Sequence, residues 1–172
     1  MTITFRRANL WGVCYISNVV GSSSPESKSR LSLIAPAFNE EDKIVGFLRK
    51  VVCVLNSLGY EYEVLVVDDG STDLTRQRAM SAVTDSRVRV ISYSCNQGKG
   101  WAAREGIRHA YGDIAIFMDS DSEVSPQNLR QYVLALQKAD IAIASKRHPG
   151  STVSAPILRK FLITHSMFLC KS

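Results

Sequence analysis

The chain has 172 residues, of which 45% are hydrophobic and 22% charged, and its formal net charge is +5. These values are typical of a globular domain and exclude a wholly disordered chain. The positive charge suits phosphate-bearing ligands or an anionic membrane surface, but the basic residues are spread along the chain, which disfavours nucleic-acid binding. No segment approaches the roughly 20 apolar residues that a membrane-spanning helix needs.

The first 30 residues are predicted to be a poorly ordered extension that ends in a Ser-rich linker, GSSSPESKSR, over 21–30. The apolar segment 10–20 is interrupted by Ser17 and Asn18 and has no clear cleavage site, so a signal peptide is disfavoured. The four cysteines form no CxxC pair and lack zinc-finger spacing, which indicates free thiols in a reducing compartment. We therefore expect a cytoplasmic protein whose folded domain begins at Leu31.

From Leu31 onward, short apolar runs alternate with longer amphipathic segments. Asn39 is a good N-cap for a helix over 40–58, and Gly59 can end that helix. Pro126 suits the first position of a later helix. The expected strands are 31–36, 63–67, 88–92, 114–118 and 141–144, and the other expected helices are about 73–83, 98–110 and one from 126. This alternation predicts an α/β fold with an open, mostly parallel, doubly wound sheet and helices on both faces.

Polar clusters follow four of the predicted strands. They read PAFNEE (36–41), DDGSTD (68–73), DSDSE (119–123) and SKRHPGS (145–151). Ligands of open α/β sheets bind outside the carboxyl ends of the strands, so we expect these clusters to meet at one site.

The segment 119–123 carries alternate acidic residues directly after a strand. Asp119 and Asp121 can project oxygen ligands to one side, and Mg²⁺ or Mn²⁺ favours carboxylates, water and substrate phosphates. The position of this DxD triplet at a buried strand's end leaves a metal site and a solvated turn as equal alternatives.

The other clusters each allow two interpretations. Asp68 and Asp69 can form a turn, or they can accept hydrogen bonds from a base or ribose. Lys99 lies in a Gly-rich segment that lacks the full phosphate-loop pattern. Either Lys99 contacts a phosphate, or the glycines of this segment serve only close packing of the backbone. Lys146 and Arg147 suit a diphosphate but also fit a solvated basic loop.

Five segments occur in the order and spacing of a known family: PAFNEE (36–41), VVDDGSTD (66–73), NQGKGWAAREG (96–106), MDSDSE (118–123) and ASKRHPGS (144–151). Residues 31 to about 160 thereby resemble the family 2 glycosyltransferases of GT-A fold, especially the dolichyl- or polyprenyl-phosphate sugar synthases. The resemblance implies a nucleotide-diphosphate sugar donor (GDP-mannose or UDP-glucose), a divalent Mg²⁺ or Mn²⁺, and a lipid-phosphate acceptor at the cytoplasmic face of a membrane.

The resemblance also assigns a nucleoside pocket. Pro36, Phe38 and Glu40 would line it, and Phe38 stands where the family often has tyrosine. Val67 and Asp69 would contact the base and ribose.

At the diphosphate, the resemblance places metal ligands and basic residues. Metal and phosphate binding would fall to Asp119, Ser120, Asp121, Glu123 and either Lys146 or Arg147. Glu123 stands where the family often has glutamine. Asp121 and Arg147 are the expected catalytic residues.

The family implies inverting transfer of a hexose to a phosphate oxygen, which is already anionic and needs no strong general base. Family members usually continue beyond this length, so residues 161–172 are expected to be an incomplete segment and the acceptor site incomplete. The alternative is a non-catalytic nucleotide-sugar-binding remnant. A receiver or haloacid-dehalogenase fold is disfavoured, because PAFNEE and Ser92-Tyr93-Ser94 stand where those folds need their aspartates.

Overall fold

The computed structural model describes residues 4–6, 13–17, 30–82, 85–120, 125–136 and 141–144, and for 4–6, 13–17 and 141–144 it describes the backbone alone. The strands are β1 (Thr4–Arg6), β2 (Val13–Ser17), β3 (Leu31–Ala37), β4 (Tyr62–Asp68), β5 (Val88–Ser92), β6 (Ile114–Phe117) and β7 (Ile141–Ala144). The helices are α1 (Ile44–Leu58), α2 (Thr75–Ala82), α3 (Lys99–His109), the 3₁₀ helix η1 (Pro126–Asn128) and α4 (Leu129–Leu136). Among the described helices, none is both long and apolar enough to cross a membrane.

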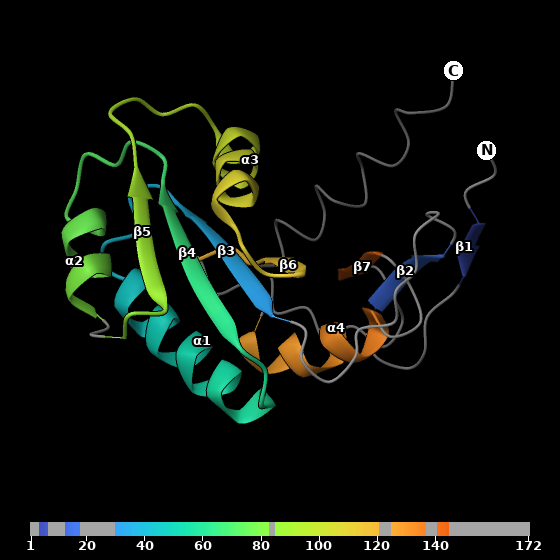
Figure 1. Ribbon diagram of the computed structural model, residues 1–172. Coiled ribbons are helices and arrows are strands. Elements are labelled where there is room, and N and C mark those ends of the chain that lie inside the picture. The colour runs from blue at the N-terminus through green and yellow to red at the C-terminus, as the bar shows by residue number, and fades with distance from the viewer. Residues whose placement is uncertain are drawn as a thin grey trace, which may run out of the picture.

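Four strands form an open parallel sheet in the order β5-β4-β3-β6 (Figure 1). All seven residues of β4 are buried, as expected for a central strand covered on both faces. In the register, Leu33 lies opposite Val64 on one side and Ile116 on the other. The predicted α/β class with an open parallel sheet is confirmed.

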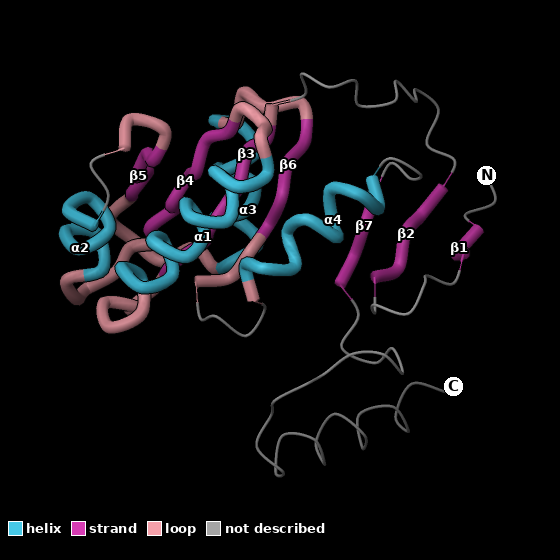
Figure 2. The backbone as a smooth tube through the Cα atoms, turned by 90° about the horizontal axis from the view of Figure 1, so that it is seen from below, coloured by secondary structure: helices cyan, strands magenta, loops and turns pink. Residues whose placement is uncertain are grey.

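Helices cover both faces of this sheet (Figures 1 and 2). One face packs against α1, α2 and α4 through a large core that includes Leu33, Phe47 and Leu129. The opposite face packs against α3 through a smaller core of Ile34, Leu65, Val67 and Ala102. Alternation of side chains along β3 and β4 supplies both cores, as the pleat of a strand requires.

The start of the first helix differs from the sequence prediction. Asn39 was expected to be the N-cap, but α1 begins at Ile44 with Lys43 in the cap position and no side-chain cap hydrogen bond. Asn39 instead has a positive φ of 52° and joins a loop. Its side chain accepts a hydrogen bond from the Thr72 backbone N–H (3.0 Å), so a contact with the next loop replaces the local cap. Gly59 ends the helix in the left-handed conformation, as predicted.

The last strand also differs from its prediction. Residues 141–144 form β7, but this strand does not join the parallel sheet; it pairs antiparallel with β2 in a separate sheet of order β1-β2-β7. The expectation of a fifth parallel strand is wrong, because periodicity identifies a strand but not its partner. The strands β1 and β2 lie within residues 1–30, where the sequence predicted a poorly ordered extension.

Candidate functional site

A cleft of about 280 Å³ opens at the carboxyl ends of the parallel strands. The chain runs from β3 to β4 on one side and later to β6 on the other, so the cleft lies where the strand order reverses. Its lining comes from three of the predicted polar clusters and from the Gly-rich segment that contains Lys99: Pro36, Ala37, Phe38, Glu40, Asp69, Asn96, Gly98, Lys99, Asp119 and Ser120.

One wall is a pair of loops held together by polar contacts. The Glu40 backbone N–H donates to Thr75 Oγ1 (2.8 Å), and the Leu74 N–H donates to Glu41 Oε2 (2.9 Å). Asp73 accepts from the Glu41 N–H at 3.2 Å and from the Thr75 N–H at 2.9 Å. Burial opposes ionisation of Asp73, but hydrogen bonds from Thr75 and Glu41 outweigh it and lower the pKa of this carboxyl. Glu41 after β3 and Asp73 after β4 therefore fix the loop that carries Phe38 and Glu40.

A second wall is organised by the Asp69 carboxylate, which is 3% exposed. Its Oδ1 accepts from Tyr93 Oη (2.7 Å) and from the Gln97 N–H (2.8 Å), and its Oδ2 accepts from the Gly98 N–H (2.9 Å). Burial and the bond to Asp69 raise the pKa of Tyr93, so the phenol stays a neutral donor. Asp69 thus anchors the loop that leads into α3.

Gly70 lets this loop approach closely. Its φ is +70°, and a Cβ at this position would lie 2.6 Å from the Asn96 nitrogen and 2.6 Å from the Cys95 carbonyl carbon. Both the backbone conformation and the contact exclude a side chain here.

The third wall follows β6. Ser120 is buried and its Oγ donates to the Pro36 carbonyl (3.3 Å), which holds the segment after β6 beside β3. Asp119 is 40% exposed and pairs with Lys99, whose Nζ lies 2.5 Å from its Oδ2. The Lys99 side chain is 68% exposed, so this ion pair is open to solvent at the mouth of the cleft.

The structure gathers most of the expected site residues. Six of them line the cleft: Pro36, Phe38, Glu40, Asp69, Asp119 and Ser120. Val67 does not line it, because its side chain is fully buried in the core beneath α3. The remaining candidates, Asp121, Glu123, Lys146 and Arg147, lie outside the described residues.

Sequence reasoning missed two residues. Tyr93 anchors Asp69, and Asn96 lines the cleft. Tyr93 directly follows the end of β5, and its place at the same sheet edge as Asp69 was the available signal. The sequence allowed two interpretations for the Lys99 segment, a phosphate contact or backbone packing. In the structure Lys99 lines the cleft.

Solved structures with the same fold identify the class of protein. Glucosyl-3-phosphoglycerate synthase of M. tuberculosis matches 65% of this chain and 42% of its own length with a TM-score of 0.54 and 29% identity. A structure of this enzyme in complex with Mn²⁺, UDP and phosphoglyceric acid matches equally well, with 29% identity and a TM-score of 0.54 over 65% of this chain and 40% of its own. A parallel sheet of this order with its cleft at the switch point is the GT-A glycosyltransferase fold.

The chain belongs to glycosyl transferase family 2, whose model matches residues 32–166. It is 29% identical to the dolichyl-phosphate beta-glucosyltransferase of Saccharomyces cerevisiae over 71% of this chain and 42% of that protein. It is 30% identical to the dolichol-phosphate mannosyltransferase of Pyrococcus furiosus over 77% of this chain and 38% of that protein. The chain therefore spans less than half the length of these curated relatives.

Proposed function

We propose that this chain binds a nucleotide-diphosphate sugar in the cleft and serves transfer of a hexose to a polyprenyl phosphate. The observation that carries the proposal is the position of an acidic group, Asp119, and a basic group, Lys99, at the mouth of one cleft. The sugar synthases among its relatives, which are named for dolichyl phosphate, support the acceptor class. GDP-mannose and UDP-glucose are the donors to test.

The lining divides the cleft into two chemical regions. Pro36 and the half-exposed ring of Phe38 offer apolar surface on which a base can stack. Lys99 offers a cation for the diphosphate. In this proposal Asp69 contributes mainly by fixing the loop of Lys99, since both of its oxygens already accept hydrogen bonds from that loop.

A divalent metal fits the described part of the site. Mg²⁺ and Mn²⁺ are commonly held by one or two carboxylates together with substrate phosphates. Asp119 is an accessible carboxylate that already faces a cation, the Lys99 ammonium. We propose that Asp119, Asp121 and Glu123 would hold the metal, which would neutralise charge on the leaving diphosphate, and that Lys146 or Arg147 would bind the same diphosphate.

The proposed reaction replaces one glycosidic bond. An oxygen of the acceptor phosphate bonds to the anomeric carbon from the face opposite the diphosphate, the bond to the diphosphate oxygen breaks, and the configuration inverts. Lys99 stabilises the negative charge that develops on the leaving group. No side chain has to remove a proton, because the acceptor oxygen is already anionic.

Calorimetric titration of UDP-glucose and GDP-mannose with Mn²⁺ tests donor binding. We expect Asp119→Ala to weaken binding of the preferred donor at least about tenfold. Asp113→Ala, at the opposite end of β6, is the matched control and should leave affinity unchanged. Absence of binding by either donor, or equal binding by the Asp119 variant, contradicts the proposal.

Transfer of labelled sugar to a polyprenyl phosphate tests the reaction separately. Product formation with inverted configuration supports the full proposal. Donor binding without product supports the alternative, a non-catalytic nucleotide-sugar-binding role.

A further inference from the structure

The outer face of α3 combines exposed aromatic, aliphatic and basic side chains. Trp101 is 41% exposed, Ile107 is 52% exposed, and Arg104 and Arg108 are also exposed. At 100° per residue these four side chains span about 120° of the helix, centred opposite the buried residues Ala102 and Gly106. We name these four residues, together with Tyr111 just beyond the helix, the α3 surface.

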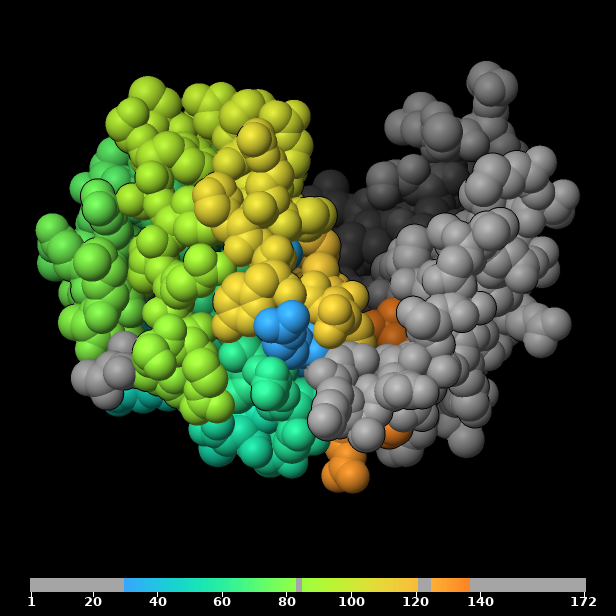
Figure 3. Space-filling view, in the orientation of Figure 1, coloured from blue at the N-terminus to red at the C-terminus, as the bar shows by residue number. Residues whose placement is uncertain are grey.

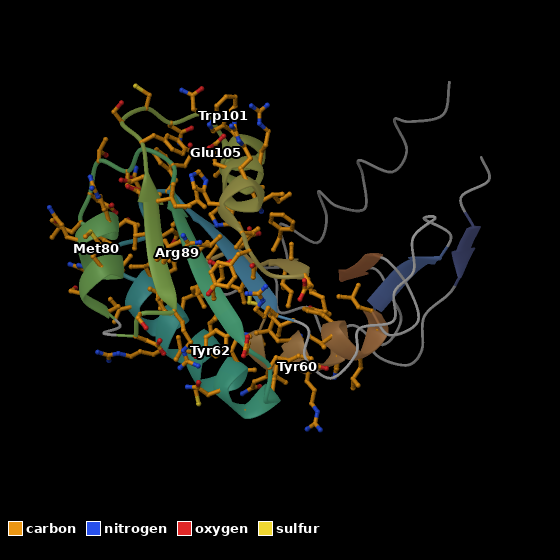
Figure 4. The ribbon with its side chains drawn as sticks, in the orientation of Figure 1. Tyr60, Tyr62, Met80, Arg89, Trp101 and Glu105 are labelled. Atoms are coloured by element: carbon orange, nitrogen blue, oxygen red, sulfur yellow. The ribbon has the colours of Figure 1, made fainter. Side chains whose placement is uncertain are left out.

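Both arginines contact side chains of α3 itself. The Arg104 guanidinium lies 4.5 Å from the centre of the Trp101 ring, and Arg108 makes a 3.5 Å contact with Glu105. The Glu105 side chain is 17% exposed whereas that of Arg108 is 63% exposed, so the outward side of the α3 surface is basic. Figure 4 labels Trp101 in the first turn of α3 and Glu105 further along the helix, and Figure 3 shows α3 as part of the molecular surface.

We propose that the α3 surface binds the anionic headgroup layer of a lipid bilayer. Tryptophan and tyrosine favour the membrane–water interface, and arginine on the same helix face attracts anionic lipids. Ile107 adds apolar contact that a nucleic-acid or soluble phosphate ligand would not use. The inference rests on the proposed function for its purpose, because a polyprenyl phosphate is presented at a bilayer.

The position of the α3 surface fits this purpose. Gly98 and Lys99 line the cleft, and Trp101 follows two residues later on the same helix. Contact through α3 would therefore bring the mouth of the donor cleft to the bilayer surface. By contrast, α1 exposes Arg49 and Lys50 but no large apolar side chain among its residues.

Vesicle sedimentation tests the surface directly. The whole chain should sediment with phosphatidylcholine vesicles containing about 30% phosphatidylglycerol and not with phosphatidylcholine alone. Each arginine near an anionic surface strengthens binding roughly fivefold, so Arg104→Glu with Arg108→Glu should weaken it at least about 25-fold. Arg49→Glu with Lys50→Glu makes the same change in net charge on α1 and should weaken binding less than about threefold.

A fluorescence measurement locates the contact. The chain has two tryptophans, so Trp11→Phe leaves Trp101 as the single emitter. Its emission should shift to shorter wavelength on anionic vesicles and be quenched by brominated lipid. Far-UV circular dichroism and the thermal midpoint verify that each variant is folded.

Three outcomes overturn the inference: no binding to anionic vesicles, equal weakening by the α1 and α3 variants, or retention of single-stranded RNA without vesicle binding. Calorimetry with the nucleotide sugar keeps the two proposals separate. Loss of donor binding in every chain contradicts the proposed function and leaves the vesicle result standing. Normal donor binding without vesicle contact contradicts the α3 surface alone.

Discussion

Replacing Asp69 by asparagine tests whether this carboxylate organises the cleft or serves only as a ligand for the donor. Three hydrogen bonds from Tyr93, Gln97 and Gly98 converge on its two oxygens. Hydrogen bonds to a charged group contribute about 1.5–3 kcal/mol each. An alanine would remove all three, which approaches the whole stability of a small domain. Asparagine is the sharper choice because it keeps one oxygen acceptor.

In Asp69→Asn, the amide can keep the bonds from Tyr93 and Gln97 but turns a donor toward the Gly98 N–H. We expect a loss of about 2–3 kcal/mol in the free energy of unfolding, because the charged bond from Gly98 is lost while the Gly98 N–H keeps Asn96 Oδ1 (3.0 Å) as an acceptor. Urea unfolding followed by circular dichroism measures this loss. Hydrogen exchange of the Gln97 and Gly98 amides, which are bonded to Asp69, should also accelerate.

Asp68→Asn is the matched control, because Asp68 is equally buried yet has a single hydrogen bond from a described residue, the Ser71 N–H at 3.1 Å. It should cost about 1 kcal/mol and leave exchange at Gln97 and Gly98 unchanged. The reasoning is refuted if Asp69→Asn stays within about 0.5 kcal/mol of the parent with unaltered exchange. Weaker donor binding without any change in stability would instead make Asp69 a direct ligand.

Three further changes probe the scaffold. Gly70→Ala should cost at least about 2 kcal/mol in unfolding free energy, since it adds a 2.6 Å contact to a left-handed backbone. Gly59→Ala, with open space around its Cβ, should cost only about 1 kcal/mol. Similar losses in the two variants would contradict the close approach of the backbone at Gly70. Glu63→Ala should cost about 3 kcal/mol, because it removes the buried carboxylate that accepts from Ser32, Tyr111 and the half-exposed Arg89, and thermal unfolding that barely shifts would argue against this network. The folded-state pKa of Asp73 is lowered, so its contribution to stability is present above about pH 4 and is lost as pH falls through the folded pKa; urea titrations between pH 2 and 5 should show a smaller acid loss in Asp73→Asn.

Local patterns predict the parallel part of this fold well. The strands β3 to β6 are short apolar runs with turn residues at their ends, and Gly59 stops α1 where the sequence indicates. A local sequence pattern does not determine whether a side chain or a strand pairs with a neighbour in the chain or with a distant segment. Asn39 has the chemistry of an N-cap, yet its side chain bonds Thr72, 33 residues away. The strand 141–144 has the pattern of a sheet strand, yet its partner is β2.

The candidate site follows the same division. The rule that ligands bind at the carboxyl ends of parallel strands brings Asp119, Phe38 and Asp69 together without knowledge of a single contact. The rule does not tell which carboxylate faces a ligand and which faces the protein. Asp69 and Glu41 turn out to anchor loops, because each accepts backbone N–H groups from a neighbouring loop. A sequence pattern cannot separate these roles, since both place an acidic residue at a strand end.

The ion pair of the scaffold, Glu63–Arg89, and that of the cleft, Asp119–Lys99, differ in how far their carboxylates are exposed. Glu63 is fully buried and also accepts from Ser32 Oγ (2.6 Å) and the Tyr111 N–H (2.8 Å), so its carboxylate is costly to remove even though its partner Arg89 is 44% exposed, and these bonds hold the end of the sheet opposite the cleft. Asp119 and Lys99 are 40% and 68% exposed, and an exposed pair is worth about 0–1 kcal/mol. Such a pair cannot compete with a divalent cation at the carboxylate or with a diphosphate at the ammonium. The pair at the cleft can therefore exchange partners, which is what the proposed binding of a divalent cation and a diphosphate would require.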